Sequence, residues 1–146
     1  MKPLDLRLAP PRGPRETLAG VVFLPRAIDK LHATLPGGDP GAYFPFYGLS
    51  TLFSHLTKID LEELRGVIAR AETEEEVVAW AQPHLTPEVV SKTNHVMNGF
   101  TQEKIPADFL AVFQSVAAPH LRDRHSNLFD LLEADDEAAF QGVAEG

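Results

Sequence analysis

The sequence contains, at residues 24–31, the stretch Leu24-Pro25-Arg26-Ala27-Ile28-Asp29-Lys30-Leu31, and the rest of the chain is interpreted around it. Proline fixes one backbone dihedral and lacks an N–H, so Pro25 suits the first helical position. Apolar side chains follow at i, i+4, i+7 and i+11, which places them on one helical face. They are Leu24, Ile28, Leu31 and Leu35. We expect this face to anchor the hydrophobic core.

The opposite face of this helix carries four ionisable side chains, namely Arg26, Asp29, Lys30 and His32. One interpretation is a site for an anionic ligand, because an arginine offers a planar donor fork and a lysine a point charge. A second is a solvated face, on which Arg26 and Asp29 form an i, i+3 pair worth about 0.2–0.5 kcal/mol. A third is a buried ion pair of Arg26, with Asp60 or Asp130 as its partner.

Composition excludes several classes of protein. A chain of 146 residues with 44% hydrophobic and 23% charged residues is typical of one globular domain. The absence of cysteine excludes disulfides, thiolate catalysis and zinc–thiolate sites. The net charge of −8, with 13 basic residues spread among 21 acidic ones, argues against nucleic-acid binding.

Membrane insertion is not expected either. The longest apolar run, Leu18–Leu24, is far too short to span a bilayer. The first five residues, Met1-Lys2-Pro3-Leu4-Asp5, do not resemble the start of a signal peptide. We therefore expect a cytoplasmic protein.

The N-terminal third raises the hardest choice of secondary structure. Residues 1–14 contain four prolines and one glycine, which predicts an extended arm, and Leu4, Leu6 and Leu8 alternate as if one side lay on the core. Val21-Val22-Phe23 favours a strand, but no second strand is evident nearby to pair with it. We therefore expect a helical segment over residues 15–35, kinked at Pro25.

A loop of roughly a dozen residues follows this helix. It begins with the breaker cluster Pro36-Gly37-Gly38-Asp39-Pro40-Gly41 and ends with Tyr43-Phe44-Pro45-Phe46-Tyr47. Long loops in compact domains are often functional. We expect the four aromatic rings to pack on another part of the protein rather than remain in water.

From residue 49 onward, apolar residues recur with helical spacing, and three helix ends are marked. Asp60 with Glu63 and Thr73 with Glu76 are capping boxes, and Asn98-Gly99 indicates a helix end. A helix from Pro106 is expected to bury five residues: Phe109, Leu110, Phe113, Val116 and Ala117. The last helical stripe is predicted at Leu121, His125, Leu128 and Leu132, with His125 in the core. Asp135-Asp136 is expected to cap a short terminal turn containing Phe140.

These patterns predict one all-α domain over residues 1–146. We expect a single compact multi-helix domain of roughly six to nine helical segments with the extended Pro-rich N-terminal arm at 1–14. No period-2 strand pair, internal repeat or linker is evident in the sequence.

Several of these stretches resemble one family. They are residues 24–30, the Ile59-Asp60 turn, Phe129-Asp130-Leu131-Leu132-Glu133-Ala134-Asp135-Asp136, Pro14-Arg15 and the segment 74–80. Together they resemble the DUF5069 proteins, a bacterial family of unknown function. The resemblance implies an all-α fold and no particular chemistry. Lys58 stands where a glycine usually precedes Ile-Asp in the family, and Leu128 stands where an aromatic residue usually precedes Phe-Asp.

Three further residues are candidates for a ligand site. Tyr43 and Tyr47 can position a ligand by ring stacking or hydroxyl hydrogen bonds, although aromatic residues near a proline turn often form a lid on the core. Asp130 can serve as an acid only if burial or a like charge raises its pKa, and otherwise it is an exposed carboxylate.

No cofactor or metal is predicted. His120 and His125 are five residues apart, so they do not share a helical face, and no His-Glu-x-x-His motif occurs. Phosphate-binding loops, nucleophile elbows and dinucleotide fingerprints are also absent from the sequence.

Two functions remain open. The first is binding of a small anionic metabolite, with or without catalysis, in a pocket between the helix starting at Pro25 and the Tyr43–Tyr47 loop; its candidate residues are Arg26, Asp29, Lys30, Tyr43, Tyr47 and Asp130. The second is a structural or interaction module that acts as a homo-oligomer or on a partner protein through an apolar helical surface.

Overall fold

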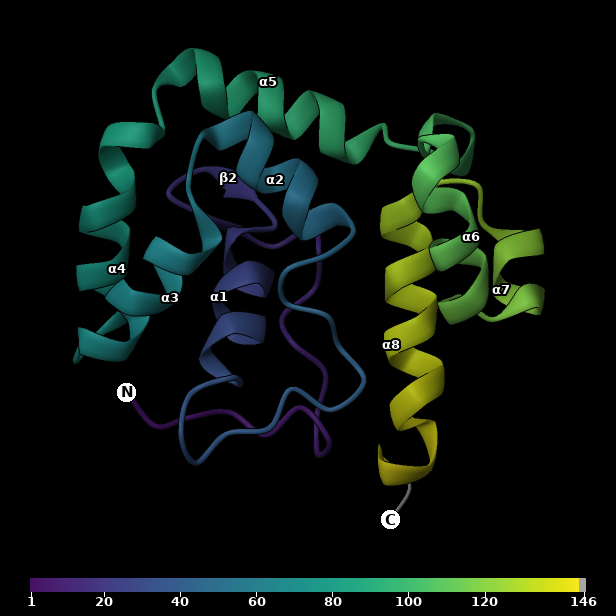
Figure 1. Cartoon of the computed structure of the whole chain (residues 1–146), viewed down its shortest axis with the longest axis horizontal. Coiled ribbons are helices and arrows are strands. Elements are labelled where there is room, and N and C mark those ends of the chain that lie inside the picture. The colour runs from purple at the N-terminus through teal and green to yellow at the C-terminus, as the bar shows by residue number, and fades with distance from the viewer. Residues whose placement is uncertain (145–146) are drawn as a thin grey trace.

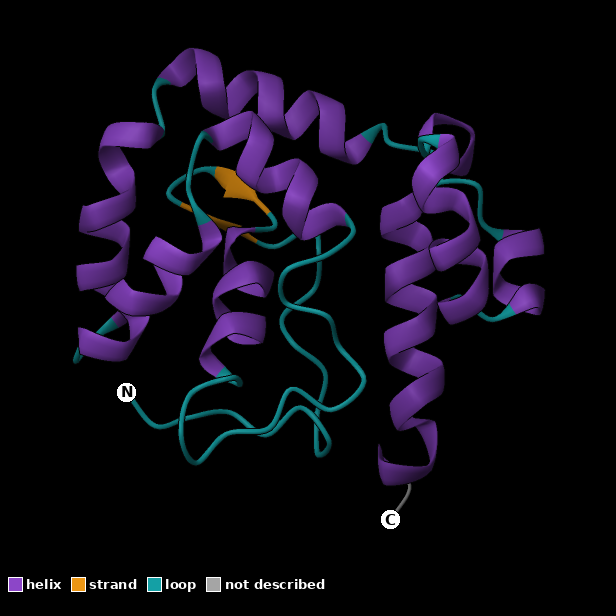
Figure 2. Ribbon diagram, viewed as in Figure 1, coloured by secondary structure: helices purple, strands orange, loops and turns teal. Residues whose placement is uncertain are grey.

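The computed structural model describes residues 1–144, apart from the side chains of Val116 and residues 141–144. In this range the chain is mainly helical, with one short hairpin (Figures 1 and 2). The elements are β1 (Thr17–Leu18), β2 (Val21–Val22), α1 (Leu24–His32), α2 (Leu49–Thr57), α3 (Leu61–Arg70), α4 (Glu74–Ala81), η1 (Gln82–His84), α5 (Pro87–Asn98), η2 (Gln102–Lys104), α6 (Ala107–Val116), α7 (Pro119–Arg124) and α8 (Leu128–Ala144).

Helix α1 lies at the centre of the molecule (Figure 1). It packs against α3, while α2 packs against α5 and α3 against α4. All nine residues of α1 are buried, including Arg26, Asp29, Lys30 and His32. The interpretation of these four side chains as a solvated face is therefore wrong. A helix buried on all sides needs partners for its polar groups, and those partners define the candidate site.

The expected helix over residues 15–23 is wrong. Thr17–Leu18 and Val21–Val22 form an antiparallel hairpin closed by Ala19 and Gly20, which have φ values of 54° and 80°. Two consecutive positive φ angles are the geometry of a type I′ turn, which normally carries asparagine or glycine. Asn94 of α5 holds the hairpin, since it accepts from Val22 N–H and donates to Gly20 O, both at 2.9 Å.

The helix caps predicted at Asp60 and Thr73 are confirmed. Asp60 accepts a hydrogen bond from Glu63 N–H at 2.9 Å, and Thr73 accepts one from Glu76 N–H at 3.4 Å. Helix α5 ends at Asn98, directly before Gly99. Local signals therefore located these helix ends correctly.

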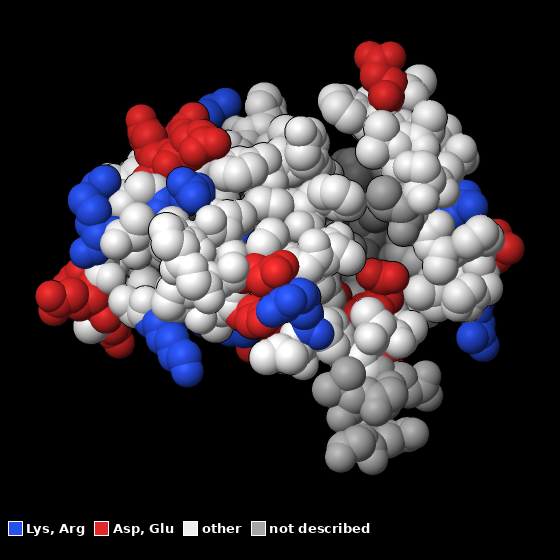
Figure 3. All heavy atoms as spheres, turned by 60° about the horizontal axis from the view of Figure 1, so that its bottom comes forward, with Lys and Arg blue, Asp and Glu red and all other residues white. Residues whose placement is uncertain are grey.

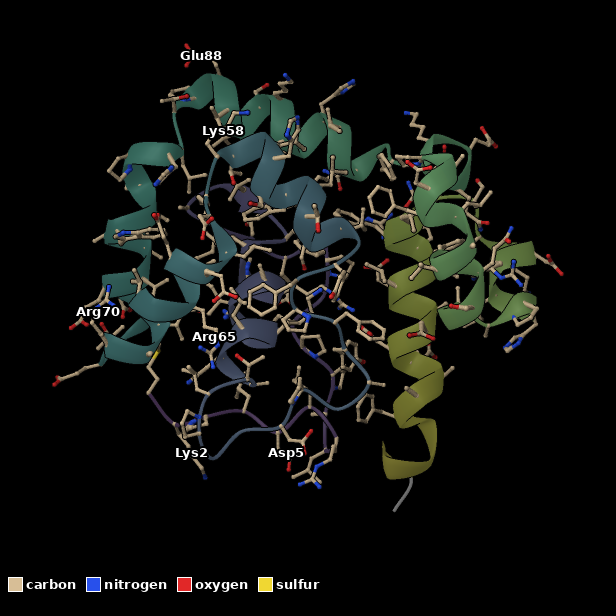
Figure 4. The ribbon with its side chains drawn as sticks, viewed as in Figure 1. Lys2, Asp5, Lys58, Arg65, Arg70 and Glu88 are labelled. Atoms are coloured by element: carbon tan, nitrogen blue, oxygen red, sulfur yellow. The ribbon has the colours of Figure 1, made fainter. Side chains whose placement is uncertain are left out.

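Lys58 ends α2 in the left-handed conformation, with φ of 62° (Figure 4). This geometry favours glycine, as does the family resemblance at this position. We expect Lys58→Gly to raise the free energy of unfolding by about 0.5–1 kcal/mol in urea denaturation. The matched control is Lys92→Gly within α5, which should lower it by about 1 kcal/mol. A destabilising effect of Lys58→Gly would contradict the assigned backbone conformation.

The first 14 residues and the long loop lie against each other. Asp5 forms a parallel bridge with Asp39, and Leu6 N–H donates to Asp39 O at 2.7 Å. The extended arm is not confirmed, because the chain turns after Leu6, and Leu8 is 69% exposed rather than on the core. Of the four aromatic rings in the loop, those of Tyr43 and Phe46 are partly buried, whereas those of Phe44 and Tyr47 are exposed.

Three expectations for the C-terminal third are wrong. Phe109 is 61% exposed instead of buried. His125 follows α7 in an extended conformation, so the stripe from Leu121 to Leu132 is interrupted. Asp135 and Asp136 do not cap a terminal turn, because they lie inside the continuous helix α8. The side chain of Val116, expected to be buried, lies outside the described residues.

Candidate functional site

Helix α8 is joined to the core beside the start of α1. Phe129 is fully buried and stacks on Phe23, with ring centroids 6.1 Å apart and planes 6° from parallel. Phe23 precedes α1 with a positive φ of 73°, an uncommon conformation for a bulky residue. Packing of Phe23 between Phe53 and Phe129 compensates for this strain.

About two helical turns after Phe129, Asp136 of α8 forms a buried ion pair with Arg26. Arg26 Nη1 lies 2.7 Å from Asp136 Oδ2, and Nη2 lies 3.1 Å from Oδ1. The Tyr43 hydroxyl donates to Asp136 Oδ1 at 2.9 Å, and the Tyr43 ring lies 5.5 Å from the guanidinium carbon of Arg26. The pKa of Tyr43 is raised by burial and by the neighbouring Asp136 carboxylate. Helix α1, the long loop and α8 thus meet at the Asp136 carboxylate.

Lys30 lies one turn further along α1 and has no carboxylate partner among the residues described. Its Nζ donates to the Phe44 carbonyl at 3.2 Å and lies 5.3 Å from the Phe23 ring centre. Burial lowers the pKa of Lys30 to about 7. The charge of Arg26 adds to this shift, and that of Asp136 opposes it. At neutral pH much of this amine is therefore uncharged.

Asp29 is bound by Arg12, whose backbone carbonyl also accepts from Arg26 Nη1 at 3.3 Å. Arg12 donates to Asp29 through its backbone N–H at 2.8 Å and through Nε and Nη2 at 3.1 and 3.0 Å. Arg12 Nη2 also contacts Glu74 of α4. This arrangement uses the Asp29 carboxylate to hold the N-terminal residues onto α1, separate from the Lys30 amine.

Asp130 and Tyr47 lie outside the group of contacts around Asp136. The Asp130 side chain is 48% exposed and pairs with Arg15 at 2.7 Å, and Arg15 also pairs with Glu133. Tyr47 is 68% exposed, and its ring meets that of Phe44 edge to face. Of the six sequence candidates, the structure therefore brings Arg26, Lys30 and Tyr43 together.

A cavity of about 250 Å³ lies beside Tyr43, between residues 6–7, the loop and the second half of α8. Its walls include Leu6, Tyr43, Asp135 and Phe140. Partial burial raises the pKa of Asp135, and the adjacent Asp136 carboxylate raises it further. Between α1 and the loop, Arg26 contacts Asp136 beside Tyr43, and Lys30 contacts the Phe44 carbonyl.

The sequence analysis missed Asp136, Arg12 and Phe129. A signal for Asp136 was present, because it follows Phe129 and Leu132 at i+7 and i+4 on one helical face. An acid on the apolar stripe of a helix needs a buried cation, and Arg26 supplies it. No comparable signal connects Arg12 with Asp29.

Other sites are not supported by the described residues. Within them, no group of three or more histidine, aspartate or glutamate side chains is arranged to hold a metal ion. On the face in Figure 3, basic and acidic side chains are interspersed rather than gathered into a basic patch. No helix within residues 1–144 is both long and apolar enough to cross a membrane.

Comparison with known proteins agrees with the motifs. No curated protein matches the chain. The model of the family described as "Domain of unknown function (DUF5069)" matches residues 8–138. This range includes Arg26, Lys30, Tyr43 and Asp136, and it covers nearly the whole sequence. The chain therefore belongs to the DUF5069 family.

Proposed function

We propose that the protein binds a small anionic metabolite at the Lys30 amine, between α1 and the Tyr43–Tyr47 loop. The observation that supports this proposal is a buried amine whose only hydrogen-bond partner among the described residues is the Phe44 carbonyl. Buried charges in proteins are normally paired. The neighbouring cation, Arg26, already has its carboxylate in Asp136, whereas Lys30 has no anion within the part of the chain that the structure describes.

The loop offers the route by which a ligand would reach the amine. It forms no helix or strand, and Gly41 and Gly48 at its ends have φ values of 57° and 64°. The exposed rings of Phe44 and Tyr47 add little to its packing on the core. Segments with few buried contacts open at low free-energy cost. Displacement of the Phe44 carbonyl would free Lys30 Nζ for an anionic oxygen.

Lys30 is expected to reduce stability in the absence of a ligand. Its pKa of about 7 lies below the ordinary value of 10.5, so the unfolded state binds more protons between these values. Stability should therefore rise with pH from about 7 to 10, by up to roughly 1.4 kcal/mol per unit. Lys30→Met, which removes the amine at similar length, should be at least as stable as wild type at pH 7 and should lose this slope.

The measurement is urea denaturation of wild type and Lys30→Met at several pH values between 6 and 9.5, with Lys92→Met as the exposed-lysine control. The difference between the first two proteins isolates Lys30 from Tyr43, whose raised pKa acts in the opposite direction above pH 10. Equal slopes in the two proteins would show that the amine is charged and solvated.

Binding is tested by calorimetry with inorganic phosphate and with a panel of mono- and dicarboxylates. An anion next to Lys30 raises its pKa, so binding at pH 7.5 should take up protons. The observed enthalpy should then differ between two buffers with different ionisation enthalpies. Lys30→Met should bind at least about tenfold more weakly, and Lys92→Met should match wild type. Unchanged affinity in Lys30→Met would contradict anion binding at Lys30.

An interaction module is the second candidate, supported by two exposed apolar side chains on α6. Phe109 is 61% and Val112 60% exposed, and they are i, i+3 neighbours on one helical face. Sedimentation equilibrium of wild type and Phe109→Ser tests it. A concentration-dependent dimer that Phe109→Ser dissociates would support this function, and a monomer at every concentration would argue against self-association.

A further inference from the structure

We propose that Lys30 is a covalent site that forms a Schiff base with small 2-oxo acids. This inference rests on the proposed anion site and adds the chemical class of its ligand. A 2-oxo acid carries a carboxylate next to an electrophilic carbonyl carbon. It can therefore supply the anion that Lys30 lacks and also react with its nitrogen.

The surroundings of Lys30 match those that activate a lysine as a nucleophile. An amine becomes reactive when it is desolvated in an apolar pocket or placed beside another cation. Lys30 Nζ has the ring of Phe23 5.3 Å away on one side, and the residue is only 7% exposed. Arg26, one turn earlier on α1, is the neighbouring cation, and its charge disfavours protonation of the amine.

The reaction balances without an oxidant or reductant. The neutral Nζ attacks the carbonyl carbon and gives a carbinolamine, whose hydroxyl then leaves as water. Overall, the lysine ammonium and the 2-oxo acid yield a protonated imine and one water molecule. The positive imine and the ligand carboxylate then form an ion pair inside the protein, where charges require a partner.

The chain contains its own controls. Its other four lysines, Lys2, Lys58, Lys92 and Lys104, are all exposed. At pH 7 an ordinary lysine is neutral in roughly one molecule in 2,500, whereas half of a lysine population with a pKa of about 7 is neutral. The terminal amine of Met1, which donates to Ala71 O at 3.3 Å, provides a second reference.

The experiment traps the imine by reduction. The full chain is incubated at pH 7 with pyruvate, 2-oxobutyrate or 2-oxoglutarate and cyanoborohydride, and each lysine is quantified by peptide mass spectrometry. Lys30 should be modified at least about tenfold faster than each exposed lysine, since its neutral fraction is larger by about a thousandfold and burial slows access. Acetone, which lacks the carboxylate, should modify Lys30 more slowly than pyruvate.

Two results separate this inference from the proposed function. Anion binding by calorimetry without preferential reduction at Lys30 would overturn the Schiff base and leave the anion site intact. Neither binding nor reduction would overturn both. Reduction at Lys30 that is as fast in urea as in the native protein would also overturn the inference. The reactivity of Lys30 would then not depend on the folded structure.

Discussion

Asp136→Ala is expected to lower the free energy of unfolding by about 3–5 kcal/mol. The substitution leaves the buried Arg26 guanidinium without its carboxylate and removes the acceptor of the Tyr43 hydroxyl. An unpaired buried charge is far more costly than the pair itself is favourable. Urea denaturation followed by circular dichroism measures the loss.

Two further variants test the cause of this loss. Asp130→Ala breaks an exposed pair on the same helix and should change stability by about 1 kcal/mol or less. Replacing both partners, Arg26→Met with Asp136→Leu, should recover most of the loss, because no buried charge remains. A cost for Asp136→Ala no larger than that of Asp130→Ala would show that the pair is solvated.

Phe129→Ala is expected to destabilise the protein by about 3–5 kcal/mol. The ring is fully buried against Phe23, so its removal leaves a cavity where α8 meets the core. The matched control is Phe109→Ala on α6, which removes a ring that is 61% exposed and should cost about 0.5 kcal/mol or less.

Local unfolding of α8 would be seen by hydrogen exchange in the Phe129→Ala protein. Faster exchange confined to α8 would mean that this helix separates from the core before the rest unfolds. Equal effects of Phe129→Ala and Phe109→Ala would contradict the position of Phe129 in the core.

Helices and their ends could be predicted from sequence because their causes are local. Asp60 and Thr73 cap helices through residues only three positions away. The hairpin was missed because its turn has Ala19 where asparagine is typical, and because two-residue strands give no periodic signal. Burial of Phe109 was predicted from helical spacing alone, which identifies a face but not what covers it.

The site could be predicted only in part, because helical spacing does not show what contacts a helical face. Arg26 and Lys30 are conspicuous in the sequence, but the partner of Arg26 is 110 positions away and the partner of Lys30 is a backbone carbonyl. A carbonyl partner leaves no mark in a sequence. The choice between a solvated face, a buried ion pair and a ligand site therefore depended on tertiary contacts, and for Arg26 the structure shows a buried ion pair.

The amine of Lys30 is buried and has no anionic partner among the residues described, and its titration tests this most directly. NMR of the lysine ε-carbons follows all five amines, and Lys30→Met assigns the signal of interest. We predict that the Lys30 signal titrates with a pKa of about 7, and that this pKa rises when a binding anion is added. A Lys30 signal that titrates at the ordinary lysine pKa of about 10.4 would contradict a buried amine without an anion.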